Sequence, residues 1–203
     1  AWSPLRRVYR ALMQARRIQS VITFPSDTNT TTIHNYFMEI ALQQAQEADR
    51  IGEVPIGAIV VRPMPNSPST RFQVLSRASN QVETTHDASA HAELLAMRQA
   101  SSRIRNWRLL NSTLYSTLEP CPMCLAACQS FRIHQIVYGA PDLRLGAIET
   151  HMQLLEVPHP FHNISTIIKD VHGNESKEML QVFFKRRRQE SKQQKKNKRR
   201  KAI

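Results

Sequence analysis

Four side chains of the sequence, in two short segments, have the types that a catalytic metal site requires. His91 and Glu93 are separated by one residue, and Cys121 and Cys124 are separated by two. A catalytic zinc ion takes three protein ligands and leaves its fourth position to water, so one imidazole and two thiolates form a suitable set. Zinc makes its bound water far more acidic, and a nearby carboxylate can then carry protons to the substrate. We therefore interpret His91, Cys121 and Cys124 as metal ligands and Glu93 as the proton shuttle.

The spacing of these residues predicts that each segment lies at the start of a helix. Residues two apart on a helix do not share a face, but in a first turn both His91 and Glu93 can point into one cavity. Cys121 and Cys124 are three apart, so one turn brings both sulfur atoms to the same side, and a helix N-terminus favours the thiolate form. Cys128 lies on the same face one turn later, either as a spare ligand or as a small buried residue.

Neither segment is specific when it is taken alone. A His-x-Glu segment carries little information by itself, and a Cys-x-x-Cys segment also occurs in redox pairs of the thioredoxin type. Together, in this order and with a helix-sized gap between them, the segments form the pattern H-x-E…P-C-x-x-C, which is the general signature of zinc-dependent nucleobase deaminases. The joint pattern therefore favours a deaminase over a redox protein.

The 203 residues suit one domain with extensions, and the positive charge of the chain lies at its two ends. Residues 1–26 contain five arginines and no acidic residue, residues 185–203 contain eleven Lys and Arg residues against one Glu, and the part between them has a net charge of −3. We expect a basic flexible or transit-like extension at 1–29, a zinc deaminase domain at 30–184, and a basic helix end and tail at 185–203. Such tails bind polyanions, although a tail that only aids solubility has the same composition.

Cysteine content and the composition of the N-terminal segment bear on the compartment. Three cysteines, two of them in the motif, argue against a disulfide framework and for reducing surroundings. The Arg-rich, acid-free N-terminal segment resembles an organelle transit peptide. We therefore expect a plastid or another organelle if this segment is a transit remnant, and the cytoplasm if the protein is bacterial. No stretch approaches the roughly 20 apolar residues of a membrane-spanning helix, so we expect no membrane partner.

Hydrophobic periodicity predicts an α/β fold around the two metal-binding segments. Strands that alternate with helices imply a partly parallel sheet covered on both faces, so we expect a three-layer α/β/α fold with a mixed sheet of about five strands. Both metal-binding segments follow a strand and open a helix, which is where sites form in such sheets. The expected strands lie at about 57–61, 72–76, 110–117, 136–138 and 164–168, and the expected helices at about 34–52, 90–102, 122–131, 149–155 and from Glu175 into the tail.

Several longer motifs resemble the bacterial-type tRNA-specific adenosine deaminase of the cytidine-deaminase-like superfamily. The resemblance covers about residues 34–196. The cysteine motif alone fits any enzyme of the superfamily, whereas the Glu-Val-Pro-x-Gly-Ala stretch and the Phe-Phe-basic segment point to the tRNA branch. The motifs are Glu53-Val54-Pro55-Ile56-Gly57-Ala58, His86-Asp87 ahead of Ala90-His91-Ala92-Glu93, Thr117-Leu118-Glu119-Pro120-Cys121-Pro122-Met123-Cys124, Val137-Tyr138-Gly139-Ala140-Pro141-Asp142, His159-Pro160 followed by Asn163, and Phe183-Phe184-Lys185-Arg186-Arg187-Arg188.

The resemblance implies a cytidine-deaminase-like fold and a homodimer with one zinc ion per subunit, acting on the anticodon stem-loop of a tRNA. The implied reaction is hydrolytic deamination of the wobble adenosine to inosine, in which a zinc-bound hydroxide attacks adenine C6 and Glu93 moves the protons. Asp142 would meet the RNA near the flipped base, where a contact with the 2′-hydroxyl favours RNA over DNA. Phe184 and the basic residues after it would line the groove for the anticodon loop. The full set of expected substrate contacts is Asn80, Val54, Ala92, Asp142, Asn163, Phe184, Lys185 and Arg187.

The sequence also departs from the family pattern. Ala88 stands where the family usually has proline, Ile164 stands where a histidine is common, and the loop at 63–70 is longer than in compact bacterial members.

Two other functions stay open. A deaminase of small purines or pyrimidines would need no basic tail, and a non-catalytic, zinc-stabilised RNA-binding subunit would need neither Glu93 nor an open metal position.

Overall fold

The computed structural model describes residues 20–66 and 69–201, with side chains through residue 197. The expected transit-like segment therefore lies outside the described residues except for its last part. In chain order, the elements are β1 (Val21–Thr23), α2 (Thr30–Arg50), β2 (Gly57–Pro63), β3 (Arg71–Ser79), α3 (Val82–Thr85), α4 (Ala92–Ile104), β4 (Thr113–Leu118), α5 (Pro122–Phe131), β5 (Gln135–Ala140), the 3-10 helix η1 (Leu154–Glu156), β6 (Thr166–Ile168) and α6 (Gly173–Lys201).

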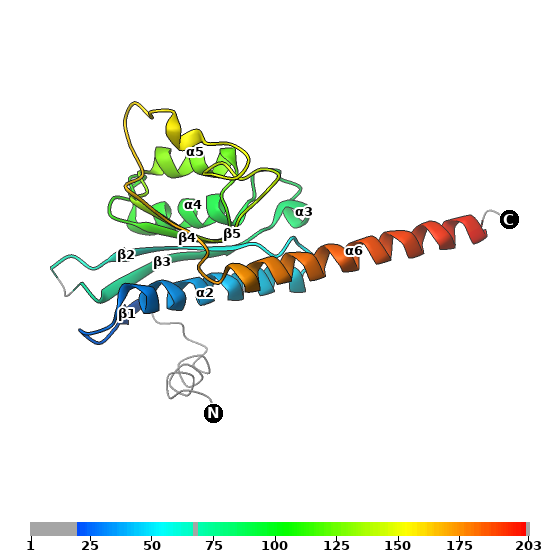
Figure 1. The fold of residues 1–203 in the computed structure, drawn as a ribbon, viewed down its shortest axis with the longest axis horizontal. Helices are drawn as coiled ribbons and strands as arrows, with labels where there is room; N and C mark the ends of the chain where they lie inside the picture. Colours follow the sequence, from blue (N-terminus) through cyan, green and yellow to red (C-terminus); the bar gives the residue numbers. More distant parts are fainter. Residues whose placement is uncertain (1–19, 67–68, 202–203) are drawn as a thin grey trace.

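The strands form one mixed sheet in the order β1-β3-β2-β4-β5-β6. The pairs β1–β3, β3–β2 and β2–β4 are antiparallel, and the pairs β4–β5 and β5–β6 are parallel. Helices α4 and α5 cover one face of the sheet, and α2 and α6 cover the other, which gives the layers visible in Figure 1. The expected three-layer α/β/α fold is confirmed, with one strand more than the five predicted.

Strand β2 contributes side chains to a hydrophobic core on each face of the sheet. Its side chains point alternately to the two faces, as the period of two requires. Ala58 and Val60 belong to the core under α4 and α5, whereas Ile59 and Val61 belong to the core under α2. Gly57 opens the strand so close to α2 that a Cβ atom there would overlap backbone atoms of that helix. The glycine thus allows α2 to lie directly on the sheet.

Strand β1 was not predicted, because it lies in the segment expected as an extension. Val21–Thr23 pairs with Arg71–Gln73 of β3, and the N–H of Val74 donates to the carbonyl of Ser20 over 2.9 Å. Three residues are too few to show an alternating pattern in a basic segment. Residues 21–23 of the expected extension thus join the sheet, while the division into domains at residue 30 stays a prediction. Helix α2 begins at Thr30 because the side chain of Asn29 caps it.

Two further expected elements differ in extent. Strand β4 begins at Thr113 rather than at residue 110, because Asn111 adopts a left-handed turn conformation with φ of 57° and Leu110 is exposed. The helix expected at 149–155 is reduced to η1. The N–H groups of Met152 and Leu154 donate to the carbonyls of Gly146 and Ala147, six and seven residues earlier, whereas a helix would use carbonyls four residues earlier. Wide turns of this loop therefore replace the expected helix.

Helix α6 contains most of the basic C-terminal segment. Its first half packs against the sheet, and its second half projects past the edge of the sheet (Figure 1). The guanidinium of Arg186 pairs with the carboxylate of Asp49 on α2, with Nη2 and Oδ1 2.6 Å apart. Among the described residues, no helix has the length and apolar character needed to cross a membrane.

Candidate active site

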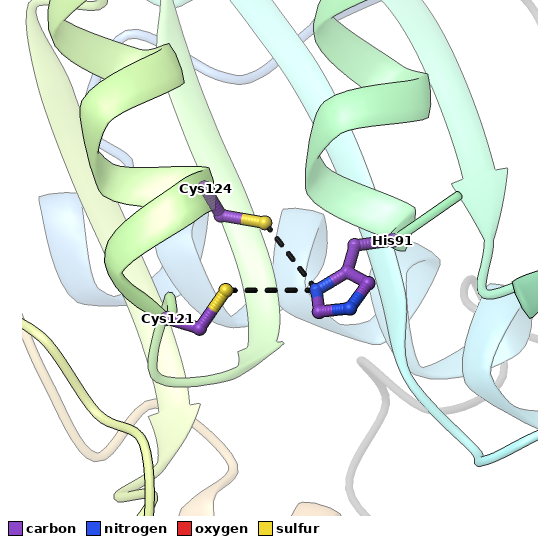
Figure 2. A group of neighbouring side chains, drawn as sticks. All are labelled: His91, Cys121 and Cys124. Carbon is purple, nitrogen blue, oxygen red and sulfur yellow. Dashed lines mark hydrogen bonds between the residues drawn. The ribbon is translucent and has the colours of Figure 1, made fainter. Parts of the chain in front are cut away.

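The three predicted metal ligands come from the starts of two helices. His91 is the residue that precedes α4, Cys121 is the residue that precedes α5, and Cys124 lies in the first turn of α5. Pro122 occupies the first position of α5, where its fixed φ suits a helix and its missing N–H is not needed. Figure 2 shows the three side chains pointing toward one another between the two helices. The sequence prediction that both segments open a helix is confirmed.

The distances between the ligand atoms suit a tetrahedral zinc ion. The Nδ1 atom of His91 lies 3.6 Å from Sγ of Cys121 and 3.6 Å from Sγ of Cys124, and all three atoms lie within 4.8 Å of one another. Zn–S and Zn–N bonds of about 2.3 and 2.0 Å at a tetrahedral angle would separate sulfur and nitrogen by about 3.5 Å. Three ligands also leave one position for a reacting molecule. The triad therefore fits a catalytic zinc ion better than a structural one, which takes four protein ligands.

The two thiols differ in acidity. The hydrogen bond from Cys124, together with the contact with His91, lowers the pKa of Cys121 to about 4, so Cys121 is a thiolate at neutral pH. The pKa of Cys124 is raised, first because Cys124 shares its proton with Cys121 and second because it is buried. Metal ions bind thiolates and release such protons. A cation in the centre of this triad would take the place of the shared proton.

Glu93 lies in the first turn of α4, next to the ligand cluster. Its side chain is 4% exposed, and its Oε2 atom has no hydrogen-bond partner among the described residues. Burial raises the pKa of Glu93 to about 7. A carboxyl group with such a pKa can both accept and return a proton near neutral pH. Its position and its free oxygen suit the predicted role of proton shuttle.

Cys128 is fully buried on α5 and stands apart from the metal-binding triad. It packs in the core between α4, α5 and the sheet. Of the two alternatives for this residue, the small buried side chain is therefore the one that the structure supports.

Asn80, Val54 and Ala92 lie on segments that converge near the triad. The N–H of Asn80 donates to the carbonyl of Ile56, and the N–H of the residue after Asn80 donates to the carbonyl of Ala90, which directly precedes His91. Ala92 is the first residue of α4, and the first N–H groups of a helix have no partner within it. These contacts bring the loop before β2 and the end of β3 beside the histidine.

Glu53 is a site residue to which the sequence interpretation assigned no role. Its carboxylate is 1% exposed and accepts hydrogen bonds from Nδ2 of Asn80 over 3.0 Å and from the N–H of Thr84 over 2.6 Å. Burial would raise the pKa of Glu53, but these hydrogen bonds outweigh it, and the pKa is lowered. Glu53 thus fixes which end of the Asn80 amide faces the site. The signal in the sequence was its place at the start of the Glu-Val-Pro-x-Gly-Ala stretch that leads into β2.

The loop that carries Asp142 lies beside Phe184 of α6. Asp142 lies in the loop after β5, and its N–H donates to Oε2 of Glu119 over 3.1 Å. The guanidinium of Arg144, from the same loop, lies 5.6 Å from the ring centre of Phe184 on α6. Phe183 is buried and Phe184 is half-buried, as expected of a pair in which one ring belongs to the core.

The basic residues that follow Phe184 lie on the surface of α6. Lys185 is exposed, and Arg187 has an exposed side chain whose guanidinium lies 3.5 Å from the carboxylate of Glu190. The expected polar contacts of α6 are therefore accessible, and they begin next to the loop that carries Asp142.

Asn163 lies far from the triad of its own chain. The neighbouring His162 contacts the carbonyl of Ile133, and Ser165 donates to the carbonyl of His134. Ile133 follows the C-terminal end of α5, whereas Cys121 precedes its N-terminal end. The length of the helix separates the two regions by about 15 Å.

Comparisons with known proteins agree with this geometry. Residues 31–140 match the zinc-binding region of cytidine and deoxycytidylate deaminases. A tRNA-specific adenosine deaminase of Bacillus subtilis (strain 168) is 37% identical over 149 residues, which are 73% of this chain and 87% of that protein. A chloroplastic tRNA(adenine(34)) deaminase of Arabidopsis thaliana is 37% identical over 169 residues, which are 76% of this chain but span only 12% of that protein.

One solved structure is similar in both fold and sequence. It comes from work on A-to-I editing by tRNA:A34 deaminases at the wobble position of transfer RNA. Its identity to this chain is 36% with a TM-score of 0.64, and the match covers 71% of this chain and 99% of the other.

Metal content separates the ligand cysteines from Cys128. We expect Cys124→Ser to retain far less than one zinc ion per chain after gel filtration, because the site loses a thiolate ligand. We expect Cys128→Ser to keep one zinc ion per chain and to lose only about 1–2 kcal/mol of stability, since a hydroxyl replaces a buried thiol. Elemental analysis and thermal unfolding measure the two effects. Zinc loss in Cys128→Ser alone would show that the ligand set is misassigned.

Proposed function

Since the chain belongs to the tRNA-specific adenosine deaminases, which carry the zinc-binding region of cytidine and deoxycytidylate deaminases, we propose that it converts the wobble adenosine of a tRNA to inosine. In this hydrolysis, water replaces the amino group at C6 of adenine and ammonia leaves. The observation that carries the proposal is the His91–Cys121–Cys124 triad with the buried carboxylate of Glu93 beside it, whose Oε2 atom has no hydrogen-bond partner among the described residues. The identity to deaminases of known specificity supports the choice of substrate.

Glu93 carries the protons of the proposed reaction. His91, Cys121 and Cys124 would hold the zinc ion, which would supply a Lewis acid that makes water a nucleophile near neutral pH. Glu93 accepts a proton from the attacking water and donates it to the ring nitrogen next to C6. It then carries the second proton of that water to the amino group, which leaves as ammonia. A carboxyl group whose pKa lies at about 7 suits both directions of transfer.

The segments around the triad supply the proposed recognition of the nucleoside. Because Glu53 accepts a hydrogen bond from one N–H of the Asn80 amide, the other N–H and the amide oxygen remain for the adenosine. Val54 and the N–H of Ala92 line the same region. Asp142 would accept a hydrogen bond from the ribose, where a contact with the 2′-hydroxyl distinguishes RNA from DNA.

The surface of α6 supplies the proposed contacts with the rest of the anticodon loop. Phe184 offers a half-buried ring on which a base can stack, and Lys185 and Arg187 offer charge to the phosphates. Residues 185–203 contain eleven basic residues against one acidic residue, which suits a polyanion.

Two alternative functions are separable from this one. A deaminase of free purines or pyrimidines would use the same triad and Glu93, but it would have no use for the basic half of α6. A non-catalytic, zinc-stabilised RNA-binding subunit would need neither an open metal position nor Glu93. Rapid release of ammonia from free bases, with no inosine in RNA, would favour the first. RNA binding without any turnover would favour the second.

We also propose that two copies form a homodimer, because Asn163 lies at the far end of α5 from its own triad. If Asn163 contacts the substrate, as the family resemblance implies, it does so at the site of a second copy. In a symmetric dimer, each chain then completes the site of its partner.

For the compartment, we propose an organelle such as a plastid if the Arg-rich N-terminal segment acts as a transit peptide, and the cytoplasm of a bacterium otherwise. The chloroplastic relative supports the first and the bacterial relatives support the second. The N-terminal residue of the protein isolated from its natural source distinguishes them, because an imported protein is cleaved within this segment.

Replacing Glu93 tests the proposed reaction. With an anticodon stem-loop that carries a wobble adenosine, we expect Glu93→Gln to slow inosine formation by about 10²–10⁴-fold, the usual contribution of a general acid–base. Zinc content should stay at one ion per chain. Glu156→Gln, on the exposed turn η1, is the control and should react like the wild type. Loss of zinc in Glu93→Gln would mean that Glu93 is a ligand rather than a shuttle.

Truncation tests the role of the basic half of α6. We expect a chain that ends after Phe184 to bind the stem-loop at least about tenfold more weakly at low salt, and to show a flatter dependence of affinity on salt, because fewer phosphates are neutralised. Lys177→Gln removes one charge near the start of the same helix and should change little. Equal affinity and equal salt dependence in the truncated chain would contradict the proposal.

Mixing two inactive variants tests the dimer. Asn163→Ala and Glu93→Gln each damage every site of their own homodimer, but a mixed dimer has one site with both Glu93 and Asn163 intact. Random exchange of equal amounts should restore about a quarter of wild-type activity if each chain completes its partner's site. Light scattering should give twice the chain mass of 23.3 kDa. A monomer, or no recovery on mixing, would contradict this arrangement.

A further inference from the structure

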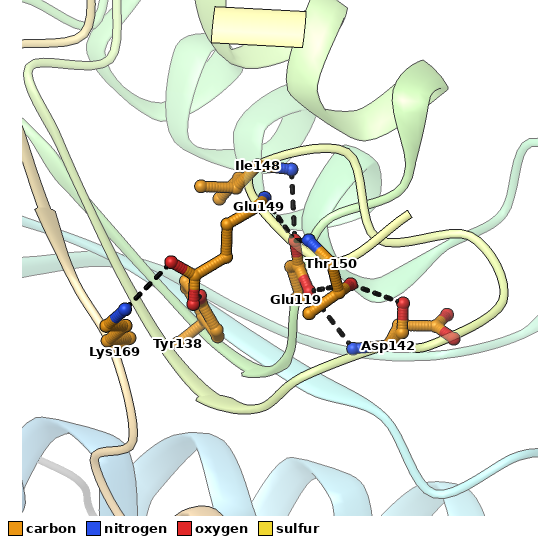
Figure 3. Close-up of polar contacts among 7 residues, drawn as sticks. All are labelled: Glu119, Tyr138, Asp142, Ile148, Glu149, Thr150 and Lys169. Atoms are coloured by element: carbon orange, nitrogen blue, oxygen red, sulfur yellow. Dashed lines mark hydrogen bonds and ion pairs between the residues drawn. The ribbon is translucent and has the colours of Figure 1, made fainter. Parts of the chain in front are cut away.

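Glu119 has a buried carboxylate that accepts hydrogen bonds from several residues of one loop. It follows β4, two residues before the zinc ligand Cys121, and its side chain is 1% exposed. All five hydrogen bonds that its carboxylate accepts come from the loop at residues 142–150, as Figure 3 shows. Its Oε1 atom accepts from the N–H groups of Ile148, Glu149 and Thr150 over 3.0, 2.9 and 3.3 Å.

The other oxygen of Glu119 holds the two ends of the same loop. Its Oε2 atom accepts from the N–H of Asp142 over 3.1 Å and from the hydroxyl of Thr150 over 2.6 Å. The Thr150 hydroxyl also lies 2.6 Å from the carbonyl oxygen of Asp142. The loop is therefore closed across Glu119, and Asp142 lies at one of the two points of closure.

Gly146 shows how closely the loop follows the carboxylate. A Cβ atom at this position would overlap Oε2 and the carboxyl carbon of Glu119 as well as the hydroxyl of Thr150. The backbone at Gly146 thus lies directly on the carboxylate, and any larger residue would push the loop away from it.

The same contacts tie the loop to the turn that carries the zinc ligands. The N–H of Ala147 donates to the carbonyl of Pro120 over 3.0 Å, and the N–H of Glu119 donates to the carbonyl of Ala140 over 2.9 Å. Pro120 directly precedes Cys121. The position of Asp142 relative to the metal centre is therefore set through Glu119 and its neighbour rather than by the loop alone.

The carboxylate of Asp142 is itself held in one orientation. Its Oδ1 atom accepts a hydrogen bond from the N–H of Arg144 over 3.0 Å, which leaves Oδ2 to meet a substrate. Arg144 in turn lies against the ring of Phe184. A contact of this kind depends on placement, because a displacement of about 1 Å can cost about a hundredfold in rate.

We propose that Glu119 is a positioning residue that fixes the Asp142 loop against the zinc-binding turn and so sets the preference of the enzyme for a ribose at the target nucleotide. This inference rests on the proposed function, in which Asp142 meets the 2′-hydroxyl. Glu119 does not touch the substrate and acts only through Asp142. A merely structural Glu119 would affect stability and turnover alike, without changing the choice between ribose and deoxyribose.

The test compares two stem-loops that differ only in adenosine or 2′-deoxyadenosine at the wobble position. We expect Glu119→Gln to raise KM for the ribose substrate about tenfold with kcat nearly unchanged, and to reduce the ribose preference in kcat/KM by about the same factor. Thr150→Val keeps the carboxylate and removes one of its five hydrogen bonds, so it should shift both values in the same direction by about threefold. Zinc content and thermal unfolding are measured for every variant.

A double-mutant cycle decides whether Glu119 acts through Asp142. If it does, Glu119→Gln should change the ribose preference of Asp142→Asn by less than about twofold, because the contact is already lost. Additive effects, or an unchanged preference in zinc-loaded Glu119→Gln, would overturn the inference. If Glu119→Gln does not fold, Thr150→Val decides, and an unchanged preference in that variant has the same meaning. Failure of the wild type to form inosine in the ribose stem-loop would instead refute the proposed function.

Discussion

The metal-binding site depends on one constraint, which is that the N-termini of helices α4 and α5 lie next to each other. His91 precedes α4, and Cys121 precedes α5, so the metal-binding triad exists only if both helices lie on the same face of the sheet with their N-termini together. Small side chains along α4 favour this arrangement. Ala92, Ala96 and Ala100 recur every four residues on its buried face, and they let the helix lie close to the sheet and to its neighbour.

Three buried glutamates surround this centre, and their partners decide what each can do. Glu53 and Glu119 are enclosed by hydrogen-bond donors, which hold their charge and lower the pKa of both groups despite burial. Glu93 has one oxygen without a partner among the described residues, and its pKa is raised. A carboxylate that is fully hydrogen-bonded is a fixed part of the framework, whereas one with an unsatisfied oxygen remains open to proton transfer. The difference separates the reactive group from the two that support it.

The sequence was most informative where the chemistry restricts the choice of residue. The zinc ligands, the helices that they open and the strands β2 and β3 were all predicted, because metal coordination and apolar periodicity are local patterns. Contacts between distant segments were not accessible in this way. Residues 149–155 have a helical pattern but belong to a loop that donates hydrogen bonds to Glu119, far earlier in the chain, and β1 is defined by its pairing with β3 rather than by its own three residues. Glu53 and Glu119 stood within recognised motifs, but only the folded chain shows what they bind.

Strand β1 gives the last part of the N-terminal segment a structural role. It covers the outer edge of β3 at residues 71–73, whose N–H and carbonyl groups would otherwise be open to pairing with another chain. The pairing begins with Ser20 and is continued by the hydrogen bond from the N–H of Phe24 to the carbonyl of Thr70. Proteolytic trimming that stops before Ser20 leaves this edge closed. Trimming that passes Ser20 removes this pairing and makes that part of β3 a template for aggregation, so the start of β1 is a point at which a small change in cleavage site changes how the folded protein behaves.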